Sequence, residues 1–389
     1  MTRSTGATRF LLTYGLAHAG AVVAYSPFLT LLLPARVVEL TGDAHVAWLS
    51  AATLLGAVTA SVAGILFGWA SDTVGSRRRW VAAGLAATLA SYVPLAYAET
   101  PTALLVAVLV FQVAVNLLLA PLTAWAADAV PDDRKGVLGG LIGAGPPVGA
   151  LAGVLATMSW LPSEGARLVV VCAIIAALVL PLLVLTPPPA VESRSVRDLA
   201  LARHDLVLLW VARLLVQVAA IVLFAFLFFY FRALPDAPSQ HWIAQLIALA
   251  LVLGFPLALL VGRISDRLGP RRPFLVGAGV AMAAGLAIMA VAPGREQATA
   301  GYILFGCGMS IFLPLQATFA MQLLPRRHRH GLDLGILNLA NTLPAIGATL
   351  LTAGLVPTYG YPALLWTLSA AVTLAGACVL LVRGDAQVA

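Results

Sequence analysis

The sequence contains few charged residues. Only 10% of its 389 residues are Asp, Glu, Lys or Arg, whereas a soluble globular domain has about 25%. Hydrophobic residues make up 61% of the chain. These proportions exclude a water-soluble domain and indicate a chain whose main solvent is the lipid bilayer.

Lysine and cysteine are scarce as well. Lys135 is the single lysine among 23 basic residues, and the net charge is +7. The arginines stand in short segments between apolar runs, which is typical of membrane orientation rather than of a nucleic-acid surface. Cys172, Cys307 and Cys378 each lie alone in an apolar run. We therefore expect no disulfide, no metal site, no cofactor and no nucleic-acid partner.

Apolar runs long enough to cross a bilayer recur through the whole chain. A transmembrane helix needs about 20 mainly apolar residues. The sequence therefore predicts an all-α integral membrane protein. Its twelve spans are expected at residues 9–33, 46–70, 80–98, 102–127, 137–160, 166–186, 206–231, 241–262, 273–292, 298–323, 333–357 and 362–382.

Basic residues fall mainly on one side of these expected spans. Of the 23 basic residues, Arg213 lies within a span and only Arg36, Arg167, Arg232 and Arg295 fall on the other side. Segments rich in Arg and Lys stay in the cytoplasm. The sequence thus predicts a bacterial-type cytoplasmic (inner) membrane protein with both termini in the cytoplasm.

A short polar stretch after the second expected span occurs again after the eighth. The first copy is Gly68-Trp-Ala-Ser-Asp72-Thr-Val-Gly75-Ser-Arg77-Arg78-Arg79, and the second is Gly262-Arg-Ile-Ser-Asp266-Arg-Leu-Gly269-Pro-Arg271-Arg272. The chain therefore contains an internal duplication.

The residue types in this stretch have physical roles. Gly68 and Gly262 allow helices to approach closely, while Gly75 and Gly269 allow the positive φ of a tight turn. The aspartate of each copy can pair with arginines or stabilise the positive N-terminal end of a neighbouring helix.

Both copies read G-x-x-x-D-x-x-G-x-R-R, and this pattern resembles the signature loop of the major facilitator superfamily. The resemblance covers the whole chain and implies a secondary transporter that functions as a monomer. It implies two six-helix halves, at 1–186 and 206–389, joined by a cytoplasmic linker at 187–205. Such halves face each other across a central cavity and rock about a midplane site.

The two halves differ in charge. The resemblance implies that Asp128 joins Arg77, Arg78 and Arg79 in a lock that stabilises the state closed to the cytoplasm. Gln322 stands at its repeat position, so the first half has the fuller set of charges. A solvated helix end is the alternative for Asp128.

The fifth expected span carries Gly145-Pro146-Pro147 and Gly149. Small residues at this spacing form a tight packing surface, and the prolines must kink or break the helix. The stretch resembles the antiporter motif G-P-x-x-G-G of drug exporters, except that Ala150 replaces the last glycine. The fourth span lacks the embedded Arg that proton-coupled exporters commonly carry and has Gln112 and Asn116 instead.

The eleventh span resembles the same helix in bacterial sugar-type members of the superfamily. Asn338 and Asn341 are three residues apart and therefore share one face of the helix. They either bind a substrate hydroxyl or join helices.

His18 and Arg213 are the ionisable residues that stand out within the expected spans, at nearly matching positions of the first and seventh. Charges in a bilayer are costly, so both are candidates for function. We expect His18 to carry a proton and Arg213 to anchor the substrate. The alternatives are a packing role for His18 and a snorkelling Arg213. Other candidates for the cavity are Tyr14, Tyr25, Gln217, Gln245 and Gln316.

The sequence thus predicts a secondary active transporter for a small polar organic solute such as a sugar or organic anion. Its expected partners are that solute, a proton or other coupling ion, and the lipid bilayer. The alternatives are a proton-coupled drug or metabolite efflux antiporter and a non-transporting membrane sensor or scaffold. We do not expect the protein to be an enzyme, because no nucleophile, base or metal ligands occur at usable spacing.

Overall fold

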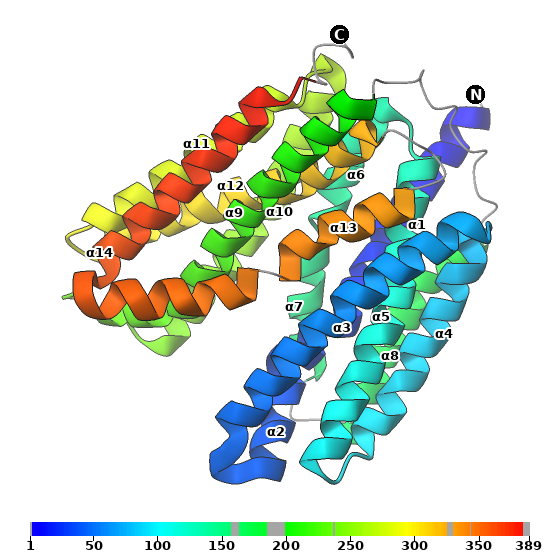
Figure 1. The fold of residues 1–389 in the computed structure, drawn as a ribbon, viewed down its shortest axis with the longest axis horizontal. Helices are drawn as coiled ribbons and strands as arrows, with labels where there is room; N and C mark the ends of the chain where they lie inside the picture. Colours follow the sequence, from blue (N-terminus) through cyan, green and yellow to red (C-terminus); the bar gives the residue numbers. More distant parts are fainter. Residues whose placement is uncertain are drawn as a thin grey trace. The chain divides into compact units, whose positions relative to one another are not determined.

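The computed structural model describes residues 2–156, 163–184, 199–235, 238–324, 330–342 and 344–383, and the regular structure in this part of the chain is helical (Figure 1). The α-helices are α1 Thr2–Pro27, α2 Leu33–Thr41, α3 His45–Thr73, α4 Arg77–Ala96, α5 Pro101–Ala129, α6 Lys135–Ile142, α7 Gly145–Ala156, α8 Glu164–Val184, α9 Leu199–Arg232, α10 Gln240–Leu268, α11 Arg272–Val291, α12 Arg295–Leu323, α13 His330–Thr342 and α14 Pro344–Leu381.

The helices match the twelve expected spans. In the described residues, ten helical stretches are long and apolar enough to cross a membrane. The 20-residue α4 corresponds to the third span, and α13 with the start of α14 corresponds to the eleventh. The expected all-α membrane fold is confirmed. Most of the 187–205 linker lies outside the described residues, and α9 begins at Leu199, before the expected 206.

Proline and glycine divide several spans. The fifth breaks between α6, which ends at Ile142, and α7, which begins at Gly145. This confirms the predicted effect of the proline pair. The eleventh is divided before Pro344, and Gly360, with φ of +74°, separates it from the twelfth within α14. In the first span, α1 is followed by a π-helical turn at Phe28–Leu32 and then by α2, so the helical structure extends beyond the expected end at residue 33.

The described chain forms two compact units that exchange short segments. Unit 1 comprises Met1–Val130, Ala144–Ser193 and Arg326–Leu339, and unit 2 comprises Pro131–Gly143, Arg194–Pro325 and Ala340–Ala389. Helix α6 thus belongs to unit 2, although it comes from the first half of the sequence. Most of α13 belongs to unit 1, although it comes from the second half. The changes of unit after Gly143 and after Leu339 lie a few residues before Pro146 and Pro344.

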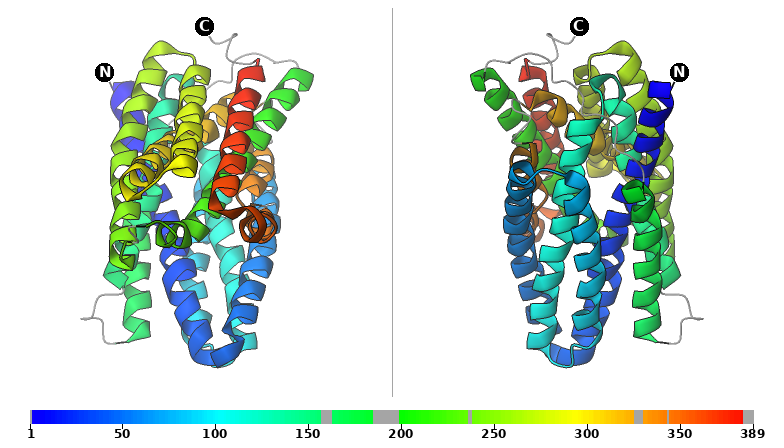
Figure 2. Two further views of the ribbon diagram at one scale, coloured as in Figure 1. Left: turned by 90° about the vertical axis from the view of Figure 1, so that its left-hand side faces the viewer. Right: turned by 90° about the vertical axis from the view of Figure 1, so that its right-hand side faces the viewer.

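Each unit is a bundle of packed helices. In unit 1, α5 packs against α3 and α4, and α1 packs against α7 and α8. In unit 2, α11 packs against α12 and α14, α14 packs against α9, and α10 packs against α6 and α12. Figure 2 shows α9 in green beside α14 in red, and α11 beside α12 in yellow.

Glycine allows the close contact between α11 and α12. A Cβ atom added at Gly285 would lie 2.5 Å from the carbonyl oxygen of Gly301 and 2.7 Å from the backbone nitrogen of Phe305. Gly277 on the same helix is exposed, and a Cβ added there would meet nothing within 4 Å. Only the first of these two glycines is therefore needed for packing.

We expect Gly285→Val to lower the thermal unfolding midpoint of the purified protein by several degrees. Overpacking typically costs about 1–3 kcal/mol, and backbone cannot move aside as a flexible side chain can. Gly277→Val on the same helix is the matched control and should leave the midpoint nearly unchanged. Equal midpoints for the two variants would contradict the role assigned to this crossing.

Candidate functional site

The aspartate of the first signature loop lies in a network of charged groups in unit 1. Arg77 donates through Nη2 to Asp72 Oδ1 at 2.6 Å and through Nε to Asp128 Oδ2 at 2.9 Å. Its Nη1 also donates to Ser71 Oγ at 2.5 Å. One guanidinium therefore joins α3, α4 and α5, as a planar group with several donors can.

The same aspartate caps helix α13. Asp72 accepts hydrogen bonds from the backbone N–H of Gly331 at 2.9 Å and of Leu332 at 3.0 Å. The N–H groups of the first turn of a helix have no partner within the helix, and its dipole favours a negative charge there. Gly68 and Gly331 are in backbone contact, so neither position has room for a Cβ. Asp72 therefore fixes the start of α13 to unit 1.

His330 completes this group of residues. Its Nδ1 lies 2.8 Å from Asp128 Oδ1, and only 7% of His330 is exposed. We call Asp72, Arg77, Asp128 and His330 the α13 cap site. The sequence analysis did not single out His330. The available signal was its place directly before Gly331, which matches Lys135 before Gly136 in the other copy of the repeat.

Unit 2 contains the corresponding arrangement. Asp266 accepts from the backbone N–H of Gly136 at 2.6 Å and of Val137 at 2.7 Å, at the start of α6. Arg271 Nη2 lies 2.8 Å from Asp266 Oδ1, and only 2% of the Arg271 surface is exposed. Gly136 is in backbone contact with Gly262. Asp266 therefore fixes the start of α6 to unit 2.

The two sites use different side chains beside the capping aspartate. Gln322, at the repeat position of Asp128, donates to the backbone carbonyl of Asp132 at 2.9 Å. Arg271 donates to the same carbonyl at 3.0 Å. Lys135 Nζ lies 2.8 Å from Asp132 Oδ1. We call Asp266, Arg271, Lys135 and Asp132 the α6 cap site.

The other residues of the two signature loops are placed as follows. Gly75 and Gly269 have φ of +71° and +91°, which confirms the predicted turns. Arg78 and Arg79 are exposed. Arg272 donates to the carbonyl of Leu380.

A cluster of polar side chains surrounds Arg213 within unit 2. Its Nη1 donates to Gln316 Oε1 at 2.7 Å and to the carbonyl of Leu313 at 3.1 Å. Its Nε donates to Asn341 Oδ1 at 2.8 Å. Gln217 also donates to Asn341 Oδ1, at 2.9 Å. These bonds hold the guanidinium among α9, α12 and α13, which differs from the snorkelling alternative.

The members of this Arg213 cluster differ in exposure. Gln316 is 1% exposed and donates to the carbonyl of Leu209 at 3.0 Å, so its amide is held at both ends. Arg213, Gln217 and Asn341 are half-buried. Asn338 is also half-buried, but it belongs to unit 1, whereas Asn341 belongs to unit 2.

His18 lies inside unit 1. Its Nδ1 is buried without a hydrogen-bond partner in the described residues, and a Cβ added at Gly145 of α7 would lie 3.4 Å from it. Tyr14 is fully buried one turn away, with ring centroids 6.3 Å apart. Tyr25, at the end of α1, is half-buried. This placement favours the packing alternative for His18.

Gln112 and Asn116 lie between α5 and α3. A Cβ added at Gly56 would lie 3.3 Å from Gln112 Nε2, and one at Gly64 would lie 3.3 Å from Asn116 Oδ1. Asn116 also donates to the carbonyl of Gln112 at 2.9 Å. Both amides are buried and occupy the space that glycine leaves at this helix crossing.

The antiporter-like motif packs α7 against α1. A Cβ added at Gly145 would lie 2.8 Å from Val22, and one at Gly149 would lie 3.2 Å from Ser26. Pro146 follows at the second position of α7, where a proline is tolerated. The motif therefore supplies close helix packing, as predicted from its small residues.

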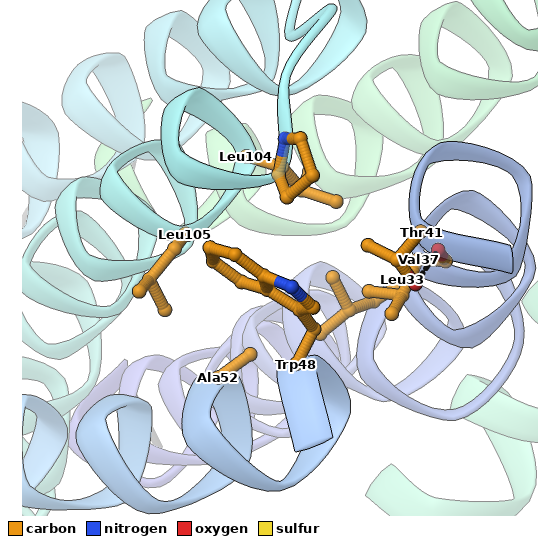
Figure 3. A pocket seen from close by; sticks show the side chains of 8 residues that line it. Leu33, Val37, Thr41, Trp48, Ala52, Leu104 and Leu105 are labelled. Atoms are coloured by element: carbon orange, nitrogen blue, oxygen red, sulfur yellow. Dashed lines mark hydrogen bonds between the residues drawn. The ribbon is translucent and has the colours of Figure 1, made fainter. Parts of the chain in front are cut away.

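Two cavities have mainly apolar linings. The first lies in unit 1 among α2, α3 and α5, beside Trp48 and Leu105 (Figure 3). Its volume of about 10 Å³ suffices for roughly one water. The second is a groove of about 340 Å³ among α10, α11 and α12 in unit 2, lined by residues such as Phe274 and Cys307. Neither lining contains a charged side chain.

We expect Asp72→Ala to increase hydrogen exchange at Gly331 and Leu332 by roughly five- to tenfold, because an N-terminal cap contributes about 1 kcal/mol. Exchange at Gly136 and Val137 should stay unchanged. Asp266→Ala should give the reverse pattern, so that each variant controls for the other. Peptide-resolved exchange with mass spectrometry measures both, and equal increases at both helix starts would contradict separate caps.

Solved structures share this fold. The chain resembles the human organic anion transporter MFSD10 (TETRAN) with a TM-score of 0.79 and 15% identity, covering 96% of this chain and 99% of that one. The proton:xylose symporter XylE bound to 6-bromo-6-deoxy-D-glucose gives 0.78 and 15%, covering 98% and 97%. The E. coli fucose:proton symporter FucP gives 0.71 and 14%, covering 96% and 97%. At such identities the likeness establishes the fold alone.

A sequence search found no match among curated proteins. The family model described as Major Facilitator Superfamily matches residues 11–349, which is most of the chain. The repeated signature loops, the helical fold and this match agree. The chain therefore belongs to the major facilitator superfamily.

Proposed function

We propose that the protein is a secondary active transporter that moves a small polar organic solute, a sugar or an organic anion, by proton-coupled alternating access. The family consists of transporters, and the structural relatives include an organic anion transporter and two sugar:proton symporters. The observation that carries the choice of solute is the Arg213 cluster.

The depth of Arg213 supports a functional role. It lies seven residues after Leu206, where the expected apolar span begins, which corresponds to roughly 10 Å along a helix. The hydrocarbon core is about 30 Å thick, so this position is about a third of the way into it. A permanent charge at this depth is costly and is typically kept for a substrate or ion.

The chemistry of the cluster fits a polar solute. A guanidinium binds carboxylate or phosphate oxygens through two parallel hydrogen bonds, and it also donates to hydroxyl groups. The amides of Gln217 and Asn341 add donors and acceptors from two further positions. Hydroxyl-rich and anionic solutes match this set, whereas a lipophilic cation would meet a like charge.

The cap sites suit a conformational gate. We propose that the halves 1–186 and 206–389, joined by the linker 187–205, move as two bodies during transport. Such motion requires the start of α13 to leave Asp72, and the start of α6 to leave Asp266. Hydrogen bonds of about 0.5–2 kcal/mol per cap are strong enough to favour the docked state and weak enough to break in each cycle.

We expect Arg213→Ala to weaken solute binding by about tenfold or more, because a hydrogen bond to a charged group contributes about 1.5–3 kcal/mol. A thermal-shift screen against sugars, organic acids, amino acids and lipophilic cations first finds the ligand. Binding and proteoliposome transport are then compared in the variants.

Arg232→Ala is the matched control for this test. Arg232 is an exposed arginine at the end of the same helix, and its guanidinium lies over the Phe228 ring at 5.7 Å. It should leave binding unchanged. Equal affinity in wild type and Arg213→Ala would reject the cluster as the solute site. Stabilisation by lipophilic cations alone would instead support drug efflux, the alternative indicated by Gly145 and Pro146.

We also propose that the protein lies in the cytoplasmic membrane with both termini and the 187–205 linker in the cytoplasm. The distribution of basic residues supports this orientation. Reporter fusions after Arg383 and within the 98–101 loop should give opposite signals, because an odd number of spans separates the two points. Identical signals from both fusions would contradict the orientation.

A further inference from the structure

The two cap sites hold the same backbone groups with different charges. In each site an aspartate accepts two backbone N–H groups of a helix start, and a buried or half-buried arginine pairs with that aspartate. A glycine forms the backbone contact beside each cap. A measurement at one cap site can therefore serve as the internal control for the same measurement at the other.

The α6 cap site contains two carboxylates and two permanent cations. Asp266 pairs with Arg271 at 2.8 Å, and Asp132 pairs with Lys135 at 2.8 Å. Lys135 is the single lysine of the chain and is 4% exposed. Arg271 and Lys135 match the two carboxylates in number, so the charges of this site balance when all four groups are ionised.

The α13 cap site contains two carboxylates and only one permanent cation in the described residues. Arg77 is shared between Asp72 and Asp128, at 2.6 and 2.9 Å. The place that Lys135 occupies before Gly136 is taken by His330 before Gly331. The imidazole lies 2.8 Å from Asp128. Counted over the described residues, this site reaches the charge balance of the other only when the imidazole carries a proton.

We propose that His330 is a proton-binding residue of the transporter, and that protonation of its imidazole beside Asp128 strengthens the docking of α13 on unit 1. A charge-assisted hydrogen bond is roughly twice as strong as a neutral one. Protonation also supplies the second cation for two buried carboxylates, and unbalanced buried charge is costly. Docking is therefore strongest at low pH and weakens as the pH rises.

The groups around His330 are consistent with this assignment. Asp128 on α5 contacts it, and Arg77 on α4 links Asp128 to Asp72 on α3. Asp333 is the next charged residue on α13 itself. Arg326–Arg329 precede it and lie outside the described residues. The nearest described groups of the α13 cap site are thus two acids and one base.

Helix α13 connects this residue to the Arg213 cluster. His330 is its first residue, in unit 1, and Asn341, which accepts from Arg213, lies eleven residues later, in unit 2. The separation corresponds to roughly 16 Å along a helix. Given the proposed transport function, on which this step rests, proton binding at one end of α13 and solute binding at the other act on a single element.

Hydrogen exchange in the purified full-length protein tests the proposal without any substrate. The quantity measured is the exchange rate at Gly331 and Leu332 divided by the rate at Gly136 and Val137, from about pH 5 to about pH 8. The ratio cancels the intrinsic pH dependence of exchange. In wild type we expect it to rise severalfold with pH, because the α13 cap loses the proton of the His330 imidazole.

Three variants define the expected result. His330→Asn retains a donor near the Nδ1 position but cannot titrate, so its ratio should be independent of pH. His330→Arg carries a permanent charge and should hold the ratio near its low-pH value. His204→Asn is the control, since His204 is exposed with Asp205 at 3.5 Å, and it should behave as wild type.

Two results would overturn the proposal: a wild-type ratio that is constant across the pH range, or the wild-type pH dependence in His330→Asn. If His330→Arg fails to fold, the comparison of His330→Asn with wild type still tests the proposal. Either of these results would leave the proposed transport function uncontradicted. Conversely, a protein that transports no polar solute but shows the titrating ratio would reject the proposed function and keep the proton site.

Discussion

The interaction on which the rest of the structure depends is a carboxylate that accepts two backbone N–H groups at the start of a helix. Asp72 does this for α13 and Asp266 does it for α6. Each bond pair holds a segment from one half of the sequence within the unit built mainly from the other half. Backbone contact at Gly68 and Gly262 brings the partners close enough for this geometry.

Two helices carry polar side chains of the Arg213 cluster. Helix α12 carries Gln316 in the Arg213 cluster and Gln322 beside the α6 cap site. Helix α13 carries Asn341 in the same cluster. In a medium without water each of these groups must find an internal partner.

Sequence reasoning placed polar residues in spans but could not say which way they face. Gln112 and Asn116 were candidates for substrate binding, yet they fill the space beside glycines of α3. His18 was a candidate for the proton, yet its Nδ1 faces Gly145. Helix membership alone does not fix the side-chain direction, because a small residue on a neighbouring helix creates room that periodicity does not reveal.

Composition, apolar run length and the repeated loops by themselves determined the membrane class, the helical fold and the duplication, because the bilayer permits few spanning structures. The turns at Gly75 and Gly269 were equally predictable, since they depend on local backbone freedom. Only the tertiary structure decided that the caps lie on α13 and α6, and that His330 stands beside Asp128. Those contacts join residues far apart in the chain, so no local pattern of charge or hydrophobicity encodes them.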